Sequence, residues 1–182
     1  MASYCDYCNS QSADTFNKTY HDTQYGFPLK DDNLLFERLI LEINQAGLSW
    51  ITILKKADNF GKAYHGFDIA KVAKYGEKDR ARLLSDPGII RNRLKINAAI
   101  VNAQRVRELQ KEYGSFCAWL DAHHPQPKEE WTKLFKKTFV FTGGEIVNEF
   151  LMSTGYLAGA HEESCPIYTR VASLRPAWMR RR

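Results

Sequence analysis

The sequence predicts an all-α fold on three observations. Across its 182 residues, no segment alternates apolar and polar side chains as a half-buried strand does. Apolar residues instead recur at helical spacing, and Leu35, Leu39 and Ala46 share one face of a helix. Polar segments containing Asp, Ser, Gly or Pro separate such stretches, as residues that cap or stop helices do.

The length and composition indicate one domain over residues 1–182, with room for two lobes. A net charge of +5 is compatible with an anionic partner such as nucleic acid. The sequence has neither an apolar run of about 18 residues nor an N-terminal secretory signal, so we expect a cytoplasmic protein without a membrane span. Without such a signal, its four cysteines indicate thiols or metal ligands rather than a disulfide framework.

The helices can be assigned in order along the chain. Residues 1–30 are polar and aromatic, which predicts loops with short helices. Asp31 and Asp32 can cap a long helix that begins near Asn33 and ends before Gly47. Later helices are expected at residues 51–56, 58–67, 69–75, 79–84, 89–109, 116–122, 131–137 and 146–151.

Basic residues are concentrated in the long helix at 89–109 and in the C-terminal tail at 175–182. Those of the long helix at 89–109 are expected to form a solvated face, with phosphate contacts as the alternative. They are Arg91, Arg93, Lys95, Arg105 and Arg107. The basic tail at 175–182 is expected to fray, as chain ends without anchoring contacts do.

A carboxylate lies within the apolar face of the first long helix. Glu42 shares that face with Leu35 and Leu39, so it must find donors, shift its pKa or face a cavity. Gly47 then breaks the helix pattern, and Leu48 and Trp50 follow it. A carboxylate beside an aromatic face can bind a flat cation. The alternative is an ordinary core helix, with Glu42 in solvent and Trp50 as packing.

A glycine-containing turn is expected between the last two helices. Residues 138–152 contain Phe141-Thr-Gly-Gly-Glu145 and then an apolar helix. Backbone amides at a helix N-terminus bind phosphate oxygens, so this hairpin is a candidate phosphate site. Glycines are also common in helix turns for steric reasons alone.

Two cysteines and two histidines near the ends of the chain form a candidate metal site. Cys5, His21, His161 and Cys165 would make a Cys2His2 set, which suits tetrahedral zinc and a structural role. The site would join the N- and C-terminal segments. Two alternatives remain: Cys8 could partner Cys5 in a C-x2-C site, or the four residues could be unrelated.

Several motifs carry a resemblance to a known family. They are Tyr20-His-Asp-x-x-Tyr-Gly-x-Pro28, Asp31-Asp32, Leu41-Glu-x-x-Gln-Ala-Gly-Leu-Ser-Trp50, Gly88-Ile-Ile-Arg-Asn-Arg93 with Lys95-Ile96, and Gly114-Ser-Phe116. Over most of residues 4–165 the chain resembles 3-methyladenine DNA glycosylase I, a bacterial base-excision repair family of the helix-hairpin-helix glycosylase superfamily.

The resemblance implies a helix-hairpin-helix glycosylase-like fold of two helical lobes. It implies that Tyr20 and Glu42 hydrogen-bond a flipped base, with Glu42 as the catalytic residue, while Trp50 stacks on the base. Leu48 would fill the gap in the duplex, and the hairpin residues Thr142, Gly143 and Gly144 would contact DNA. Structural zinc would be held by Cys5, His21, His161 and Cys165.

The implied activity is hydrolytic release of 3-methyladenine from alkylated double-stranded DNA by a monomeric, monofunctional glycosylase. Methylation at N3 makes the adenine cationic, so the base leaves readily and needs less help from a general acid. An ionised Glu42 and the electron-rich face of Trp50 would favour this cation.

The sequence also departs from the family pattern. Tyr7 and Tyr25 stand where the family has Trp, Asn17 and Asn148 where it has Tyr, and Glu145 where it has a small hydroxyl residue. A carboxylate at Glu145 would repel a phosphate. The superfamily's catalytic aspartate has no counterpart in residues 155–161, and this family is taken to work without it.

Two rival functions fit the same residues. One is a relative that binds DNA or damaged bases without efficient excision, which the altered hairpin suggests. The other is a zinc-stabilised helical interaction module with no nucleic-acid role. Release of base from N3-methylated DNA distinguishes a glycosylase from the first rival. Salt-dependent DNA binding distinguishes it from the second.

Overall fold

The computed structural model describes residues 3–180, and every regular element in that range is a helix, so the expected all-α class is confirmed. The helices are α1 (Tyr4–Cys8), α2 (Thr15–Thr23), α3 (Asp32–Gln45), α4 (Trp50–Ala63), η1 (His65–Phe67), α5 (Ile69–Val72), α6 (Glu77–Ser85), α7 (Arg93–Tyr113), α8 (Phe116–His123), α9 (Lys128–Thr138), α10 (Gly144–Ser153), α11 (Pro166–Ser173) and η2 (Ala177–Met179). Within the described range, no helix has the length and apolar character needed to cross a membrane.

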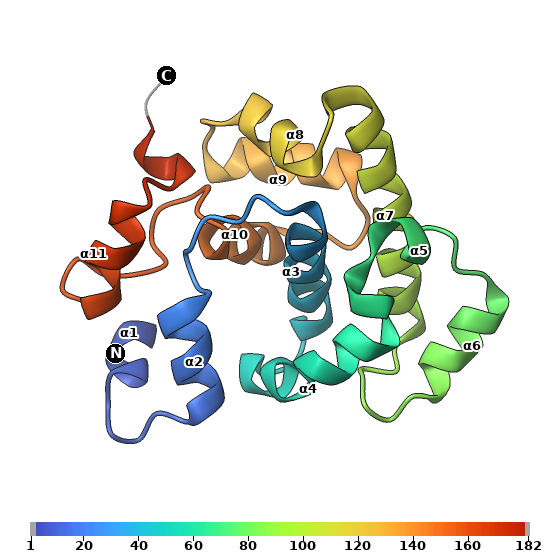
Figure 1. The fold of residues 1–182 in the computed structure, drawn as a ribbon, viewed down its shortest axis with the longest axis horizontal. Helices are drawn as coiled ribbons and strands as arrows, with labels where there is room; N and C mark the ends of the chain where they lie inside the picture. The colour runs from blue at the N-terminus through green and yellow to red at the C-terminus, as the bar shows by residue number, and fades with distance from the viewer. Residues whose placement is uncertain (1–2, 181–182) are drawn as a thin grey trace.

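Helix α3 lies at the centre of the molecule and packs against α4, α7, α8 and α10 (Figure 1). In the view of Figure 1, α5, α6 and α7 lie on one side of α3, and α1, α2 and α11 lie on the other. The two ends of the chain therefore share one lobe. Apart from the exposed Leu34, the apolar residues of α3 are buried in the core that the surrounding helices form.

Each end of α3 is held by residues that satisfy free backbone groups. At its start, the Asp31 side chain accepts a hydrogen bond from the amide of Leu34 at 3.0 Å. At its end, the Lys95 ammonium donates to the carbonyl oxygens of Asn44 and Ala46 at 2.8 and 2.7 Å. Gly47 then turns the chain with φ of +79°, a conformation that favours glycine. A cation bonded to these carbonyls fixes the corner between α3 and α4.

This role of Lys95 differs from the expectation of a solvated basic face. The other four basic residues of that segment are exposed as expected, whereas Lys95 is buried. The helix itself begins at Arg93 rather than at residue 89, because the Asn92 side chain caps it by accepting from the amide of Lys95. Ile89 lies before the helix and is buried.

Asp32 connects the start of α3 to the start of α8. Its carboxylate accepts hydrogen bonds from the amides of Phe116 and Cys117 at 2.9 and 3.1 Å. It also accepts one from the side chain of Gln110 on α7. One side chain thus satisfies two free amides of a helix N-terminus and holds three helices together.

Two other expectations from the sequence were wrong. The segments at 51–56 and 58–67 are a single helix, α4, followed by the short η1, because no proline interrupts Trp50–Ala63 and the helix continues through Asp58. The described part of the basic tail does not fray: Ala177 is buried, and the Trp178 amide donates to the Gly155 carbonyl at 3.2 Å. Residues 181–182 lie outside the described range.

Candidate functional site

A cavity of about 230 Å³ lies where α1, α2, α3, α4 and α10 meet. Its lining consists of Tyr4, Tyr20, Tyr25, Glu42, Gln45, Trp50 and Glu149. The structure therefore brings together the three residues that the sequence singled out for base binding, Tyr20, Glu42 and Trp50. Four aromatic rings and the buried carboxyl group of Glu42 make this cavity suitable for a flat, cationic ligand.

The rings of Tyr20 and Trp50 meet edge to face, with centroids 5.1 Å apart and planes at 62°. The Tyr20 hydroxyl and the Trp50 Nε1 are both buried, and neither has a hydrogen-bond partner among the described residues. Leaving such groups unpaired is costly, so these two atoms indicate a site that a ligand or water completes.

Arg38 supports this wall of the cavity from behind. Its guanidinium lies 5.1 Å from the centroid of the Tyr20 ring, and it donates to the Ser153 carbonyl at 3.1 Å. The side chain is buried, so its position is fixed by these contacts between α3, α2 and the end of α10. Arg38 thereby orients Tyr20 and places a positive charge near Glu42.

Glu42 is only 4% exposed, so the alternative of a solvated Glu42 is wrong. Burial, together with the nearby Glu149, raises the pKa of its carboxyl from 4.5 to about 8, against the opposing effect of Arg38. Burial therefore favours the protonated form of this carboxyl, and the expectation that Glu42 is ionised beside a cationic base stays a prediction. A cation bound beside it would lower its pKa and favour the ionised form.

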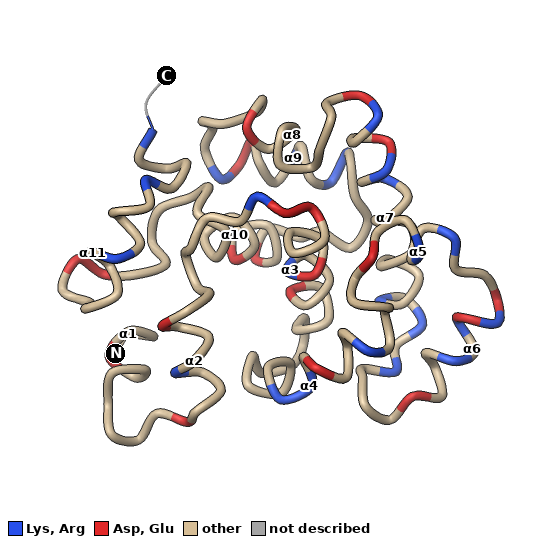
Figure 2. Tube along the Cα trace, viewed as in Figure 1, with Lys and Arg blue, Asp and Glu red and all other residues tan. Residues whose placement is uncertain are grey.

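Glu149 is a second carboxyl group in the cavity, and the sequence interpretation missed it. It lies on α10, where it is half-buried, and its Oε2 accepts a hydrogen bond from the Tyr25 hydroxyl at 3.3 Å. Burial raises the pKa of Glu149, and the Tyr25 hydrogen bond opposes this. Figure 2 shows acidic positions on α3 and α10, the two helices that pack together here. One signal was available, because Glu149 is a charged residue directly before the apolar run Phe150-Leu-Met152.

A groove of about 620 Å³ adjoins the cavity and lies between the α3–α4 corner and the hairpin. Its lining consists of Gln45, Ala46, Gly47, Gly143, Gly144, Glu145, Ile146 and Glu149. Two lining residues, Gln45 and Glu149, also line the cavity, so they mark its mouth. Leu48 follows the glycine corner and is 40% exposed, a position available for contact with a partner.

The expected hairpin lies between α9 and α10. Helix α10 has Gly143 as its N-cap and begins at Gly144, so the amides of its first turn have no partner within the helix. The Thr142 side chain is buried and its hydroxyl has no partner in the described chain, so its expected contact with DNA stays a prediction. Glu145 points outward with 90% of its side chain exposed, and its carboxylate lies 3.6 Å from the Lys128 ammonium, which partly compensates its charge.

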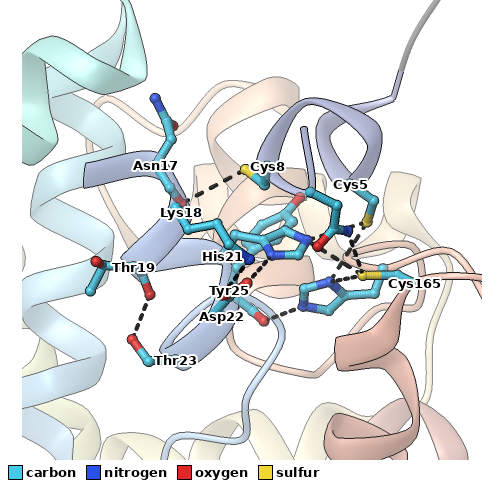
Figure 3. A network of polar contacts seen from close by, with 12 residues as sticks. Cys5, Cys8, Asn17, Lys18, Thr19, His21, Asp22, Thr23, Tyr25 and Cys165 are labelled. Carbon is cyan, nitrogen blue, oxygen red and sulfur yellow. Dashed lines mark hydrogen bonds and ion pairs between the residues drawn. The ribbon is translucent and has the colours of Figure 1, made fainter. Parts of the chain in front are cut away.

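Cys5, His21, His161 and Cys165 are all buried and converge on one point, as expected for a metal site. Their candidate ligand atoms lie within 4.8 Å of one another. Figure 3 shows Cys5 and Cys165 approaching His21 from different segments of the chain. The cluster joins α1 and α2 to the segment that leads into α11, and so ties the two ends of the chain together.

The distances within this cluster match a tetrahedral metal site. With zinc–sulfur bonds of about 2.3 Å and zinc–nitrogen bonds of about 2.0–2.1 Å, tetrahedral angles place sulfur and nitrogen about 3.6 Å apart. The Cys5 sulfur lies 3.5 Å from His21 Nε2 and 3.7 Å from His161 Nδ1. The Cys165 sulfur lies 3.6 and 3.7 Å from the same two atoms. The residues present therefore fit a zinc ion.

Hydrogen bonds on the far side of each imidazole support this assignment. His21 Nδ1 lies 2.7 Å from the Asp22 carboxylate, and His161 Nε2 lies 2.7 Å from the Tyr25 carbonyl (Figure 3). Such partners hold the proton on the outer nitrogen and turn the other nitrogen toward a metal. Cys8 is not part of the cluster, because its thiol lies 3.8 Å from the Asn17 carbonyl, so the C-x2-C alternative is wrong.

Comparison with known proteins gives consistent matches. Residues 10–133 match the family model described as methyladenine glycosylase. The chain is 36% identical over 180 residues to DNA-3-methyladenine glycosylase 1 of Escherichia coli (strain K12), covering 88% of this chain and 96% of that protein. It is 34% identical over 188 residues to DNA-3-methyladenine glycosylase of Haemophilus influenzae, covering 93% and 100%.

Solved structures show the same similarity in three dimensions. The 3-methyladenine DNA glycosylase I of Staphylococcus aureus superposes with a TM-score of 0.81 at 32% identity, covering 91% of this chain and 97% of that one. A tyrosine-to-phenylalanine variant of a 3-methyladenine DNA glycosylase I, solved in complex with 3-methyladenine, also gives 0.81 at 31% identity, covering 89% and 97%.

Proposed function

The chain belongs to the methyladenine glycosylase family, and on that premise we propose that it is a monofunctional DNA-3-methyladenine glycosylase. It would flip 3-methyladenine out of alkylated DNA and hydrolyse the bond between the base and the sugar. The observation that carries this proposal is the cavity itself, lined by Tyr20, Glu42 and Trp50, where the Tyr20 hydroxyl and Trp50 Nε1 have no partner among residues 3–180.

Recognition of the base follows from charge and shape. The N3-methylated adenine in DNA is cationic, and the Trp50 ring offers an electron-rich face. The Glu42 carboxyl lies in a cavity with little water, where a charge-assisted contact is stronger than at the surface. The cation would lower the pKa of Glu42 from about 8, so that binding and ionisation favour each other. A neutral adenine would lack this gain, which gives the cavity its selectivity.

The bond-breaking step needs little acid catalysis from the protein. When the bond between the sugar carbon and the base breaks, its electron pair neutralises the positive charge of the base. The base therefore leaves as a neutral molecule without being protonated. The contribution of Glu42 would be to stabilise the cationic base in its flipped position, since flipping a base costs a few kcal/mol.

The duplex would be held along the groove beside the cavity. The free amides at the start of α10 would bind a phosphate through the backbone at Gly143 and Gly144. Leu48 would enter the space that the flipped base vacates, as apolar side chains of other DNA-bending proteins do between base steps. Thr142 would contribute to this grip from the turn that precedes α10, where its hydroxyl has no partner in the described chain.

We assign structural zinc to Cys5, His21, His161 and Cys165. Four protein ligands leave no open position for a substrate, so the ion would hold the N- and C-terminal segments together and take no part in the reaction. The protein would act as a monomer on chromosomal DNA, in the cytoplasm of a bacterium.

The decisive experiment is release of free base from N3-methylated duplex DNA under single-turnover conditions. We expect the parent protein to release 3-methyladenine and the Glu42→Gln variant to release it at least tenfold more slowly. Binding to lesion-containing DNA without release would favour the rival reading of a relative that binds without excising. Absence of salt-dependent DNA binding would favour the rival interaction module, because phosphate contacts weaken steeply with salt.

A further inference from the structure

The second carboxyl group of the cavity, Glu149, has no role in base recognition as described above. It lies at the mouth of the cavity, since it lines both the base cavity and the neighbouring groove. Its opposite neighbour at the mouth is Gln45, which cannot ionise. Glu42 is only 4% exposed, whereas Glu149 is half-buried, so the carboxyl that water can reach is that of Glu149.

The position of the cavity mouth determines which part of a flipped nucleotide would lie beside Glu149. On the proposed function, on which this inference rests, the base occupies the cavity and a phosphate lies at the start of α10, beside Gly143 and Gly144. The sugar connects these two groups, so it must lie between Gln45 and Glu149. We infer that Glu149 is a catalytic residue that faces the sugar carbon of the bond being broken and activates the attacking water.

The chemistry balances with this assignment. The bond between the sugar carbon and the base breaks, its electron pair leaves with the base, and the sugar becomes a cation. An ionised carboxylate close by stabilises this positive charge. Water then forms a bond to the sugar carbon, and its proton passes to the Glu149 carboxylate, from which it returns to solvent. No other reactant is required.

Burial raises the pKa of the Glu149 carboxyl, and several neighbouring groups oppose this shift by favouring its ionised form. The Tyr25 hydroxyl donates to it, and Lys128 lies near enough to favour its charge, whereas Glu145 on the same helix opposes it. From α3, the Glu42 carboxyl faces the same cavity and repels the Glu149 charge when it is ionised. The cationic substrate offsets this repulsion. The segment that follows α10, residues 155–161, offers no carboxylate to take the role instead.

The test compares the rate of base release with the affinity for the base in three variants of the 182-residue chain. Glu149→Gln keeps the size of the side chain and removes its charge, Glu149→Ala removes the group, and Glu108→Gln changes an exposed glutamate on α7 as the control. For each, we would measure the affinity for free 3-methyladenine and the single-turnover rate of base release at saturating DNA. We expect both Glu149 variants to bind the base as the parent does and to release it about 10²-fold more slowly.

Added formate provides a readout that a structural role would not affect. It supplies a carboxylate to the space left in Glu149→Ala, so it should restore part of the release rate there and leave the parent and Glu108→Gln unchanged. The inference is overturned if Glu149→Gln releases base at the parent rate, or if base affinity falls in parallel with release, because Glu149 would then bind the base. Either of these results would leave the proposed glycosylase function unaffected. A parent protein that releases no base overturns the function and this inference together.

Discussion

Replacing Glu42 with glutamine should stabilise the folded protein at alkaline pH, and it is also expected to impair base binding. Burial raises the pKa of the Glu42 carboxyl to about 8, so ionising this group in the folded state is unfavourable. Glutamine has nearly the same shape and cannot ionise. The variant is therefore expected to avoid a cost that the parent protein carries for the sake of its ligand, as active sites often do.

The sign and size of this effect follow from the two pKa values. The folded state holds the Glu42 proton more tightly than the unfolded chain, in which the pKa is 4.5. The stability that this proton provides is fully present below about pH 4.5 and is lost as the pH rises through about 8. Since one pKa unit corresponds to about 1.4 kcal/mol, the loss at pH 7 is about 3 kcal/mol. Between pH 5.5 and 8.5 the parent should lose about 3 kcal/mol that the variant keeps.

Urea denaturation at pH 5.5 and 8.5 measures this difference. The free energy of unfolding of Glu42→Gln should rise relative to the parent by about 3 kcal/mol between the two pH values. Glu112→Gln, an exposed substitution on α7, is the control and should follow the parent at both pH values. Parallel pH dependences for the parent and Glu42→Gln would refute the reasoning, because they would show that Glu42 titrates alike in the folded and unfolded chain.

Three other substitutions test the supporting features. Cys5→Ala should lower zinc content and melting temperature, whereas Cys8→Ala should retain the full metal complement; full zinc in Cys5→Ala would contradict the ligand assignment. Leu48→Ala should slow excision from duplex DNA several-fold more than from single strands, with the exposed Leu174→Ala as the control, and equal losses on both substrates would indicate ordinary packing. Lys95→Met should lower the free energy of unfolding by about 2 kcal/mol, because two carbonyls at the end of α3 lose a charged donor. Unchanged stability in urea would show that water replaces the ammonium there.

The residue pattern by itself determined the helical class and the central features of the site. A helix is recognised from local spacing, so Leu35, Leu39 and Glu42 could be placed on one face without any tertiary information. The metal ligands were found in a different way. Cys5 and Cys165 are far apart along the chain, and their residue types together with the family motifs indicated a shared ion. The structure confirmed that the two residues converge: the sulfur atoms of Cys5 and Cys165 lie 3.5 and 3.6 Å from His21 Nε2.

Other properties depend on contacts between distant segments, and only the tertiary structure decided them. The sequence pattern indicated that Lys95 is one of several solvated cations. In the structure its ammonium donates to the carbonyl of Ala46 at the end of α3, a residue 49 positions earlier in the chain. The pKa of Glu42 depends on burial and on the charge of Glu149 on α10, which no local pattern specifies. Glu149 reaches the mouth of the cavity because α10 packs against α3. Helical periodicity is a property of neighbouring residues, whereas a cavity, its dielectric and its charges arise only when separate helices meet.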